Sequence, residues 1–162
     1  MSEREDPALE VVFWEVRSRR GVVTSGNRAG ASAPNGRVTV TVDIRASGRV
    51  FRGNGSDSGE VRVMDAAVSM ALAQAFPDLP LASFAFVKPG FVVKPFSLKN
   101  GFESEAIARI YYAAGKKRFC GIGRSTQTLD AILLAIVSAY HQYLAWWRDT
   151  PPDQRATSIS GS

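Results

Sequence analysis

Residues that build metal centres and disulfides are almost absent from this sequence, which contains one cysteine, Cys120, and one histidine, His141. One cysteine cannot form a disulfide within the chain, and the two residues together are too few for a zinc site. Nothing in the sequence pairs the thiol with an activating histidine, so we expect Cys120 to be a buried, inert thiol. The sequence therefore predicts no metal and no cofactor.

Long apolar runs are also missing. No stretch reaches the roughly 18 uninterrupted apolar residues typical of a membrane helix, and the N-terminal MSEREDPALE is polar and acidic. We therefore expect neither a membrane span nor a signal peptide, and a lone cysteine fits the reducing cytoplasm. Hydrophobic residues still make up 45% of the chain, which is enough for one globular core.

Acidic residues are fewer than basic ones, 15 against 20, giving a net charge of +5. Such a balance permits nucleic-acid binding without requiring it. Basic clusters at 17–20 and 116–118 stand near aromatic residues, in a pattern that would suit phosphates and bases. Successive strand residues face opposite ways, however, so Lys117 should point away from Lys116 and Arg118. The sequence thus disfavours nucleic acid as a partner.

The two ends of the chain show no apolar periodicity. We expect residues 1–8 to be a disordered N-terminus and residues 149–162, rich in Pro, Ser and Thr, to be a disordered tail. A single domain should then span residues 9–148.

The clearest strand signal is RVTVTVDIR at residues 37–45, where apolar and polar residues alternate. Residues 46–48 supply a turn and residues 49–52 the returning strand of a hairpin. Another strand is expected at residues 9–17, separated from the hairpin by a long flexible loop at 21–35. After the hairpin, an apolar stripe at helical spacing predicts a helix that ends at Pro77.

The second half of the chain repeats this order. Strands are expected at residues 91–98, 103–113 and 116–120, followed by a helix whose apolar stripe runs from Leu129 to Trp147. Pro95 should restrict its strand to a sheet edge or a bulge. The segments ASGRVFRGNG and AAGKKRFCGIG match, and each precedes a helix with an Asp-Ala step, which begins at Asp65 and at Asp130. The sequence predicts an α+β fold of two βββα units, residues 9–80 and 81–148, with antiparallel strands and two helices packed on one face.

The second helix carries more apolar surface than three strands can easily cover. Packing beside the first helix on a shared six-stranded surface would cover it, and so would a second subunit. Apolar residues on both faces of the 106–113 strand favour a homodimer.

Two glycine pairs each stand between a strand and a helix. If they form turns, ligand atoms can approach the backbone there, and the adjacent helix N-terminus attracts anions. The predicted ligand-binding residues are Gly53, Asn54, Gly55, Gly121, Ile122, Gly123, Ser125 and Thr126. The alternative interpretation is a plain strand-to-helix turn with Ser125 or Thr126 as N-cap and no ligand.

The repeated strand-strand-strand-helix order, with GNG closing one hairpin and CGIGRSTQTLDAILLAIVSAYHQYL closing the other, resembles the C-terminal regulatory and dimerisation domain of 2-isopropylmalate synthase and citramalate synthase. The resemblance implies a dimer of duplicated βββα units that binds leucine or isoleucine near the glycine turns and regulates leucine biosynthesis. It therefore implies a cytoplasmic branched-chain amino-acid sensor.

The chain departs from that family at two points. Gly55 is followed by SDSGEVRVM before Asp65, where the family has a proline and reaches the Asp-Ala step within three residues. The catalytic barrel and its paired histidines are absent, so we expect no enzyme activity. An allosteric domain acting on a separate synthase subunit, a ligand-free dimerisation or scaffold module, and a basic nucleic-acid-binding domain all remain as alternatives.

Overall fold

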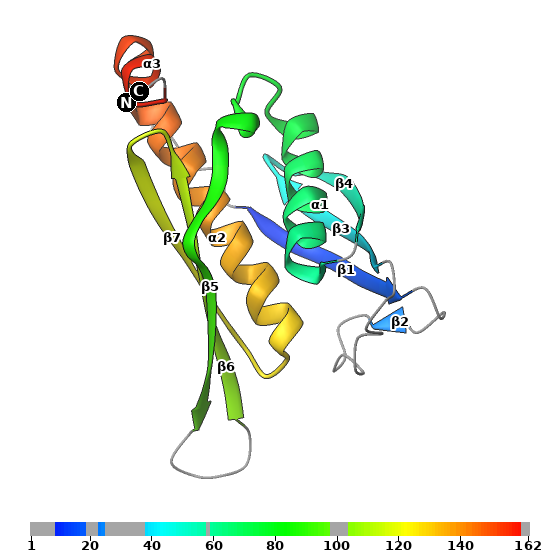
Figure 1. Cartoon of the computed structure of the whole chain (residues 1–162). Helices are drawn as coiled ribbons and strands as arrows, with labels where there is room; N and C mark the ends of the chain where they lie inside the picture. The colour runs from blue at the N-terminus through cyan, green and yellow to red at the C-terminus, as the bar shows by residue number, and fades with distance from the viewer. Residues whose placement is uncertain (1–8, 19–22, 25–37, 58, 98–103, 160–162) are drawn as a thin grey trace.

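The computed structural model describes residues 9–18, 23–24, 38–57, 59–97 and 104–159 (Figure 1). The predicted disordered N-terminus, residues 1–8, lies outside these ranges, as does most of the predicted 21–35 loop.

The first four strands form one antiparallel sheet in the order β2-β1-β3-β4, here called the first sheet. Its members are β1 (Glu10–Ser18), β2 (Val23–Thr24), β3 (Val38–Ala46) and β4 (Arg49–Asp57). The alternation predicted for β3 is confirmed, because Val40 and Val42, which share one face of the strand, are fully buried. Polar side chains occupy the other face.

The remaining strands form a second antiparallel sheet in the order β5-β6-β7. Its members are β5 (Phe84–Ser97), β6 (Ser104–Ala114) and β7 (Lys117–Ser125). A short 3-10 turn, Leu81–Ser83, precedes β5. The strand that contains Pro95 is at the sheet edge, as expected, and Pro95 pairs in regular register with Ala106. A register shift occurs earlier in the strand, between Phe86 and Phe91.

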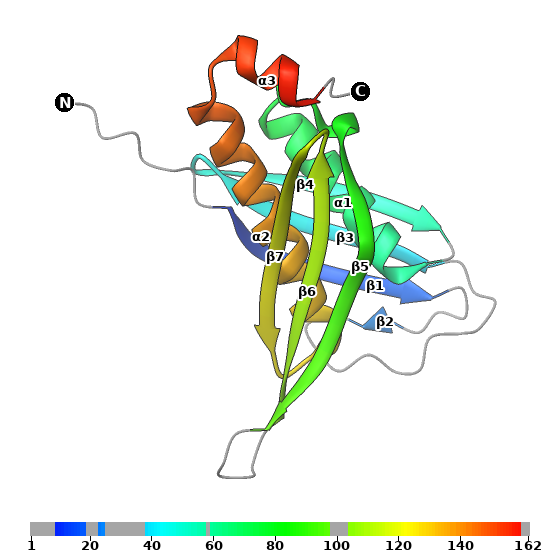
Figure 2. The ribbon, with the colours of Figure 1, turned by 60° about the vertical axis from the view of Figure 1, so that its left-hand side comes forward.

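Helices α1 (Glu60–Ala75) and α2 (Thr128–Asp149) lie side by side between the two sheets (Figures 1 and 2). The α1 helix packs on β3 and β4, and α2 packs on β6 and β7. The α+β class and the repeated βββα order are therefore confirmed. The strands make two sheets, however, and not the shared six-stranded surface considered above.

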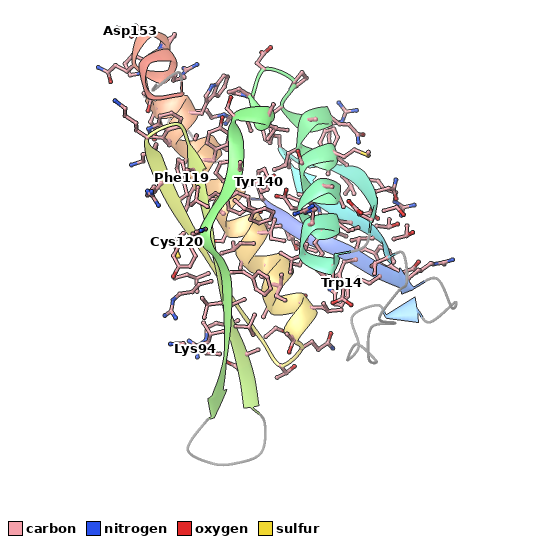
Figure 3. The ribbon with its side chains drawn as sticks, viewed as in Figure 1. Trp14, Lys94, Phe119, Cys120, Tyr140 and Asp153 are labelled. Carbon is pink, nitrogen blue, oxygen red and sulfur yellow. The ribbon has the colours of Figure 1, made fainter. Side chains whose placement is uncertain are left out.

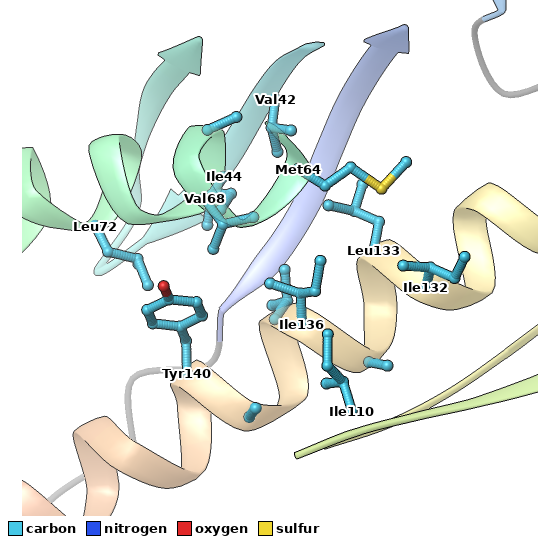
Figure 4. Close-up of a cluster of buried hydrophobic side chains, with 14 of the residues drawn as sticks. Val42, Ile44, Met64, Val68, Leu72, Ile110, Ile132, Leu133, Ile136 and Tyr140 are labelled. Atoms are coloured by element: carbon cyan, nitrogen blue, oxygen red, sulfur yellow. The ribbon is translucent and has the colours of Figure 1, made fainter. Parts of the chain in front are cut away.

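One hydrophobic core runs through all three layers (Figure 4). Val42 and Ile44 of the first sheet lie beside Met64 and Val68 of α1, while Ile136 of α2 lies between them and Ile110 of the second sheet. Each of these side chains is at most 1% exposed. The apolar stripe of α2 is thus covered from two sides within a single chain.

The duplication is free of gaps from β3 to the end of α1. Residues that play the same part in the two units differ by 68 in number, as Gly53 and Gly121 do. This register makes Asp65 equivalent to Leu133, so the predicted equivalence of Asp65 with Asp130 is wrong. The Asp-Ala step recurs at different positions of the two helices, and the packing of each helix against its strands sets the true correspondence.

The tail predicted as disordered contains a helix, α3 (Pro152–Ile159). Proline at the first helical position is favourable because its missing N–H has no partner there in any case. Arg155 then stacks on the Trp147 ring at 4.3 Å and donates to the Thr150 carbonyl at 2.6 Å. These contacts tie α3 to the end of α2. None of the helices in the described ranges is long and apolar enough to cross a membrane.

Candidate functional site

The glycine pairs lie inside strands and not in turns, so that part of the prediction is wrong. Gly53 and Gly55 belong to β4, and Gly121 and Gly123 to β7, which continues to Ser125. A Cβ atom at any of the four would come within 3.0 Å of helix backbone atoms. The absence of a side chain is what allows each helix to rest directly on its strand.

The helices meet these glycines with small residues spaced four apart. In α1 the glycine strand faces Ala67 and Ala71, and in α2 it faces Ala131, Ala135 and Ala139. Residues at this spacing share one face of a helix. Helix backbone therefore fills the space on the inner side of the glycines, and a ligand there would have to displace it.

Backbone groups along the two glycine strands are satisfied by side chains of the same helices. Gln142 donates to the carbonyl of Cys120 at 2.8 Å, and Ser138 accepts from the N–H of Ile122 at 3.4 Å. In the first unit Gln74 donates to the carbonyl of Arg52 at 2.7 Å. These bonds occupy backbone atoms that a ligand at the glycines would use.

The other predicted ligand residues are not brought together with the glycine pairs. Asn54 and Ile122 point to the outer faces of different sheets. Ser125 accepts a hydrogen bond from the N–H of Gln127 at 3.2 Å, and Thr126 is exposed. The N-cap of α2 is Gln127, so neither Ser125 nor Thr126 caps that helix.

A half-buried carboxyl group joins the two units. Asp65 of α1 accepts hydrogen bonds from the hydroxyl groups of Tyr112 at 2.6 Å and Tyr140 at 2.7 Å. Burial raises the pKa of Asp65, and the two hydroxyl donors only partly oppose that shift. Burial likewise raises the pKa of both tyrosines. The sequence marked Asp65 only as a sign of duplication, and its partners lie too far along the chain to be found from local pattern.

A second polar contact crosses between the units in the other direction. Trp14 of β1 donates from Nε1 to the Asp130 carboxylate at 3.0 Å. Trp14 is 6% exposed and Tyr112 is fully buried, so neither ring is available to stack on a base. The basic and aromatic pattern that suggested nucleic acid loses those two residues.

The outward-facing sides of the two sheets differ in chemistry. On the first sheet the outer side chains pair with one another. Arg52 forms two bonds to Asp43, at 2.7 and 2.9 Å, and Thr41 donates to Asn54 at 3.0 Å. The pKa of Asp43 is lowered by its hydrogen bond with Arg52. Paired polar side chains therefore occupy the centre of this face, although Phe13 and Val50 are also exposed on it.

The outer face of the second sheet carries apolar residues at several equivalent positions. We define this outer face as the side of β5, β6 and β7 turned away from α2, where Cys120 and Lys94 are seen in Figure 3. Ile107, Tyr111, Cys120 and Ile122 stand where the first unit has Thr39, Asp43, Arg52 and Asn54. Ile122 is 50% exposed and the other three are half-buried. Apolar residues on both faces of the 106–113 strand suggested this apolar face from the sequence. Its contrast with the first sheet could be seen only once strand pairing had established which positions of the two units are equivalent.

Cys120 and His141 are both half-buried. Within the described part of the chain, no group of three or more metal-binding side chains is present. A scan against models of known protein families finds no match for this chain, and a search of curated proteins finds none either.

Proposed function

We propose that the protein is a non-catalytic interaction domain that forms a homodimer through the outer face of the second sheet. The contrast between the two equivalent faces carries this proposal. Positions that are polar and mutually paired in the first unit are apolar in the second, while the core positions are apolar in both. Covering an exposed apolar sheet face with protein removes that surface from water.

The charges at the two ends of β6 favour a second copy as the occupant. Glu105 is at one end and Ala113 at the other, where Arg118 is the cross-strand neighbour of Ala113. Stacked sheets keep their strand directions within about 30°. If two outer faces stack with antiparallel β6 strands, Glu105 of each copy comes opposite Ala113 and near Arg118 of the other.

The mass of the protein in solution tests the homodimer. Ile122→Arg places a charge on the outer face of the second sheet and should convert the dimer to a monomer. Val50→Arg is a matched control, because Val50 is 51% exposed on the first sheet and Ile122 is 50% exposed on the second. Arginine also stands naturally at position 118, the equivalent of Val50. We expect Val50→Arg to remain dimeric by sedimentation analysis.

A wild-type protein that stays monomeric at all concentrations, both with and without a small carboxylate, would refute the homodimer. The outer face would then be left for a different protein, such as a separate synthase subunit.

We propose as a second function that the domain senses a small apolar amino acid of the leucine class and reports it to a cytoplasmic synthase. The observation that favours a ligand of this kind is Arg109, a half-buried residue whose strand neighbours on the outer face are apolar. A guanidinium suits a carboxylate, and the apolar residues suit an aliphatic tail. The helix backbone against the glycines makes the outer face the better location.

Thermal unfolding with each common amino acid at millimolar concentration tests this sensor. A ligand that binds only the folded state stabilises it by about 2.7 kcal/mol at 100 times its dissociation constant. For a domain of this size the unfolding temperature should rise by several degrees. We expect a rise with leucine, isoleucine or valine and none with glycine or lysine; equal curves with all of them would exclude amino-acid sensing.

A further inference from the structure

Arg109 stands at the centre of the outer face. It lies on β6, the middle strand, directly between Val92 of β5 and Ile122 of β7. Its neighbours on the same face of β6 are Ile107 and Tyr111. A strand neighbour two residues away points to the same side of the sheet. Four side chains that are largely or wholly apolar therefore surround this single guanidinium.

Arg109 has no acidic partner among the residues that the structure describes. The nearest acid on the same face, Glu105, forms an ion pair with Arg124 at 3.3 Å. The first unit has Thr41 at the equivalent position, where it bonds to Asn54. The second unit thus carries a charge at a position where the first unit has a neutral side chain, and the described strand neighbours of Arg109 offer no counter-charge.

Dimer formation through the outer face would bury this charge. A guanidinium removed from water without an anion is strongly unfavourable. The two-fold pairing considered above also brings the two Arg109 side chains toward each other, which adds like-charge repulsion. A counter-anion at Arg109 would remove both penalties.

We propose that each copy binds a small aliphatic carboxylate at Arg109 and that this binding drives the two outer faces together. The proposal rests on the homodimer proposed above. The planar guanidinium forms two parallel hydrogen bonds with a carboxylate, and the surrounding apolar side chains contact the aliphatic part. Since linkage is reciprocal, the carboxylate tightens the dimer and the dimer tightens carboxylate binding by the same factor.

The wild-type protein is examined first, by sedimentation at several protein concentrations and constant ionic strength. The probes are sodium isovalerate, L-leucine, leucinamide and inorganic phosphate. Isovalerate and leucine should lower the dimer dissociation constant at least about tenfold, a factor within the usual range for coupled sites. Leucinamide, which lacks the carboxylate, should have no effect. Phosphate acting where isovalerate does not would overturn the carboxylate assignment.

Substitutions at Arg109 then separate the charge from the site. Arg109→Met removes the charge but keeps an unbranched apolar stem, so the variant should dimerise without any added anion and ignore isovalerate. Arg109→Lys keeps the charge without the planar pair of donors and should lose most of the response. The matched control is Lys94→Met, which removes a charge from the exposed border of the same face and should leave the response intact.

The outcomes distinguish this inference from the proposal beneath it. If neither the wild type nor Arg109→Met forms a dimer under any condition, the homodimer itself is wrong and the inference is overturned with it. If the wild type dimerises equally with and without carboxylate, and Arg109→Met behaves like the wild type, the homodimer stands and only the anion linkage is overturned. Circular dichroism of each variant establishes that it is folded.

Discussion

Asp65 places an ionisable carboxyl group in an interior that is otherwise almost entirely apolar. Two tyrosine hydroxyls donate to the same oxygen, and they come from β6 and α2 of the second unit. This one side chain therefore helps to fix how the first helix sits against the second unit. Its raised pKa makes the strength of that link depend on pH.

The first prediction concerns the pH dependence of Asp65→Asn. Because the folded pKa lies above the ordinary value of 3.8, the folded state binds this proton more strongly than the unfolded chain does. The stabilisation from Asp65 is complete below pH 3.8 and is lost as the pH rises through the raised pKa. Asparagine keeps an acceptor for both tyrosines without a charge. The free energy of unfolding of the variant, minus that of the wild type, should therefore increase from pH 4 toward pH 7 in urea titrations.

Asp65→Ala serves as the control, since it removes the acceptor as well as the charge. Relative to Asp65→Asn, it should lower the free energy of unfolding by about 1 to 3 kcal/mol over this whole range, because the two tyrosine hydroxyls lose the acceptor that they share. Asp43, whose pKa is shifted downward, is present in all three proteins and cancels in the differences. Parallel pH curves for the wild type and Asp65→Asn would rule out a raised pKa at Asp65.

At the scale of elements, the close approach of each helix determines which residues its last preceding strand can carry. The edge strands β4 and β7 each carry a Gly-x-Gly sequence, and each lies against a row of small helix residues. A glycine in the interior of a strand weakens the strand, because it has no side chain to contribute to packing. In this protein that loss is offset by direct contact of strand and helix backbones.

The second prediction is that Gly121→Ala strongly destabilises the fold. Its new methyl group would come within 3.0 Å of the α2 backbone, which cannot move without lifting the helix from the sheet. Overpacking of this kind costs about 3 kcal/mol or more when backbone must shift. Gly59→Ala is the matched control, because a Cβ there has its nearest neighbour at 3.9 Å. A urea midpoint for Gly121→Ala equal to that of Gly59→Ala would contradict this account of β7.

The elements also show what local pattern can and cannot reveal. The alternation in β3 and the stripe of α2 were predicted because each depends on a period within one segment. The ends of β4 and β7 do not follow from local pattern, because glycine pairs are typical of turns, whereas here the approaching helix requires them. The candidate ligand residues failed for the same reason, since the identity of the group that fills the space beside Gly53 and Gly121 is a tertiary property. The α3 helix was missed because its stability depends on the contact of Arg155 with Trp147.

At the scale of the whole molecule, the two units share a single core. The helices contact each other as well as their own sheets, and polar contacts cross between the units in both directions. Neither unit covers its helix alone. The division into residues 9–80 and 81–148 describes the repeat and does not define two independently folding parts.

The third prediction is that both units unfold in one transition. In the double variant Trp146→Phe/Trp147→Phe the only remaining tryptophan is Trp14, so fluorescence reports the first unit and far-ultraviolet circular dichroism reports both. The urea midpoints from the two signals should coincide. In Trp14→Phe the fluorescence reports the second unit, and its midpoint should again match the dichroism. Separate midpoints in either protein would mean that the units unfold independently.

The gapless repeat gives this chain the form of a symmetric pair of subunits joined end to end. A free single unit would have to find a second one by diffusion before its helix face was covered, so its folding would depend on its concentration. Linking the two units in one chain makes that encounter intramolecular and holds the partner at a high effective concentration. The helix faces of the two units are therefore covered without any encounter between separate chains.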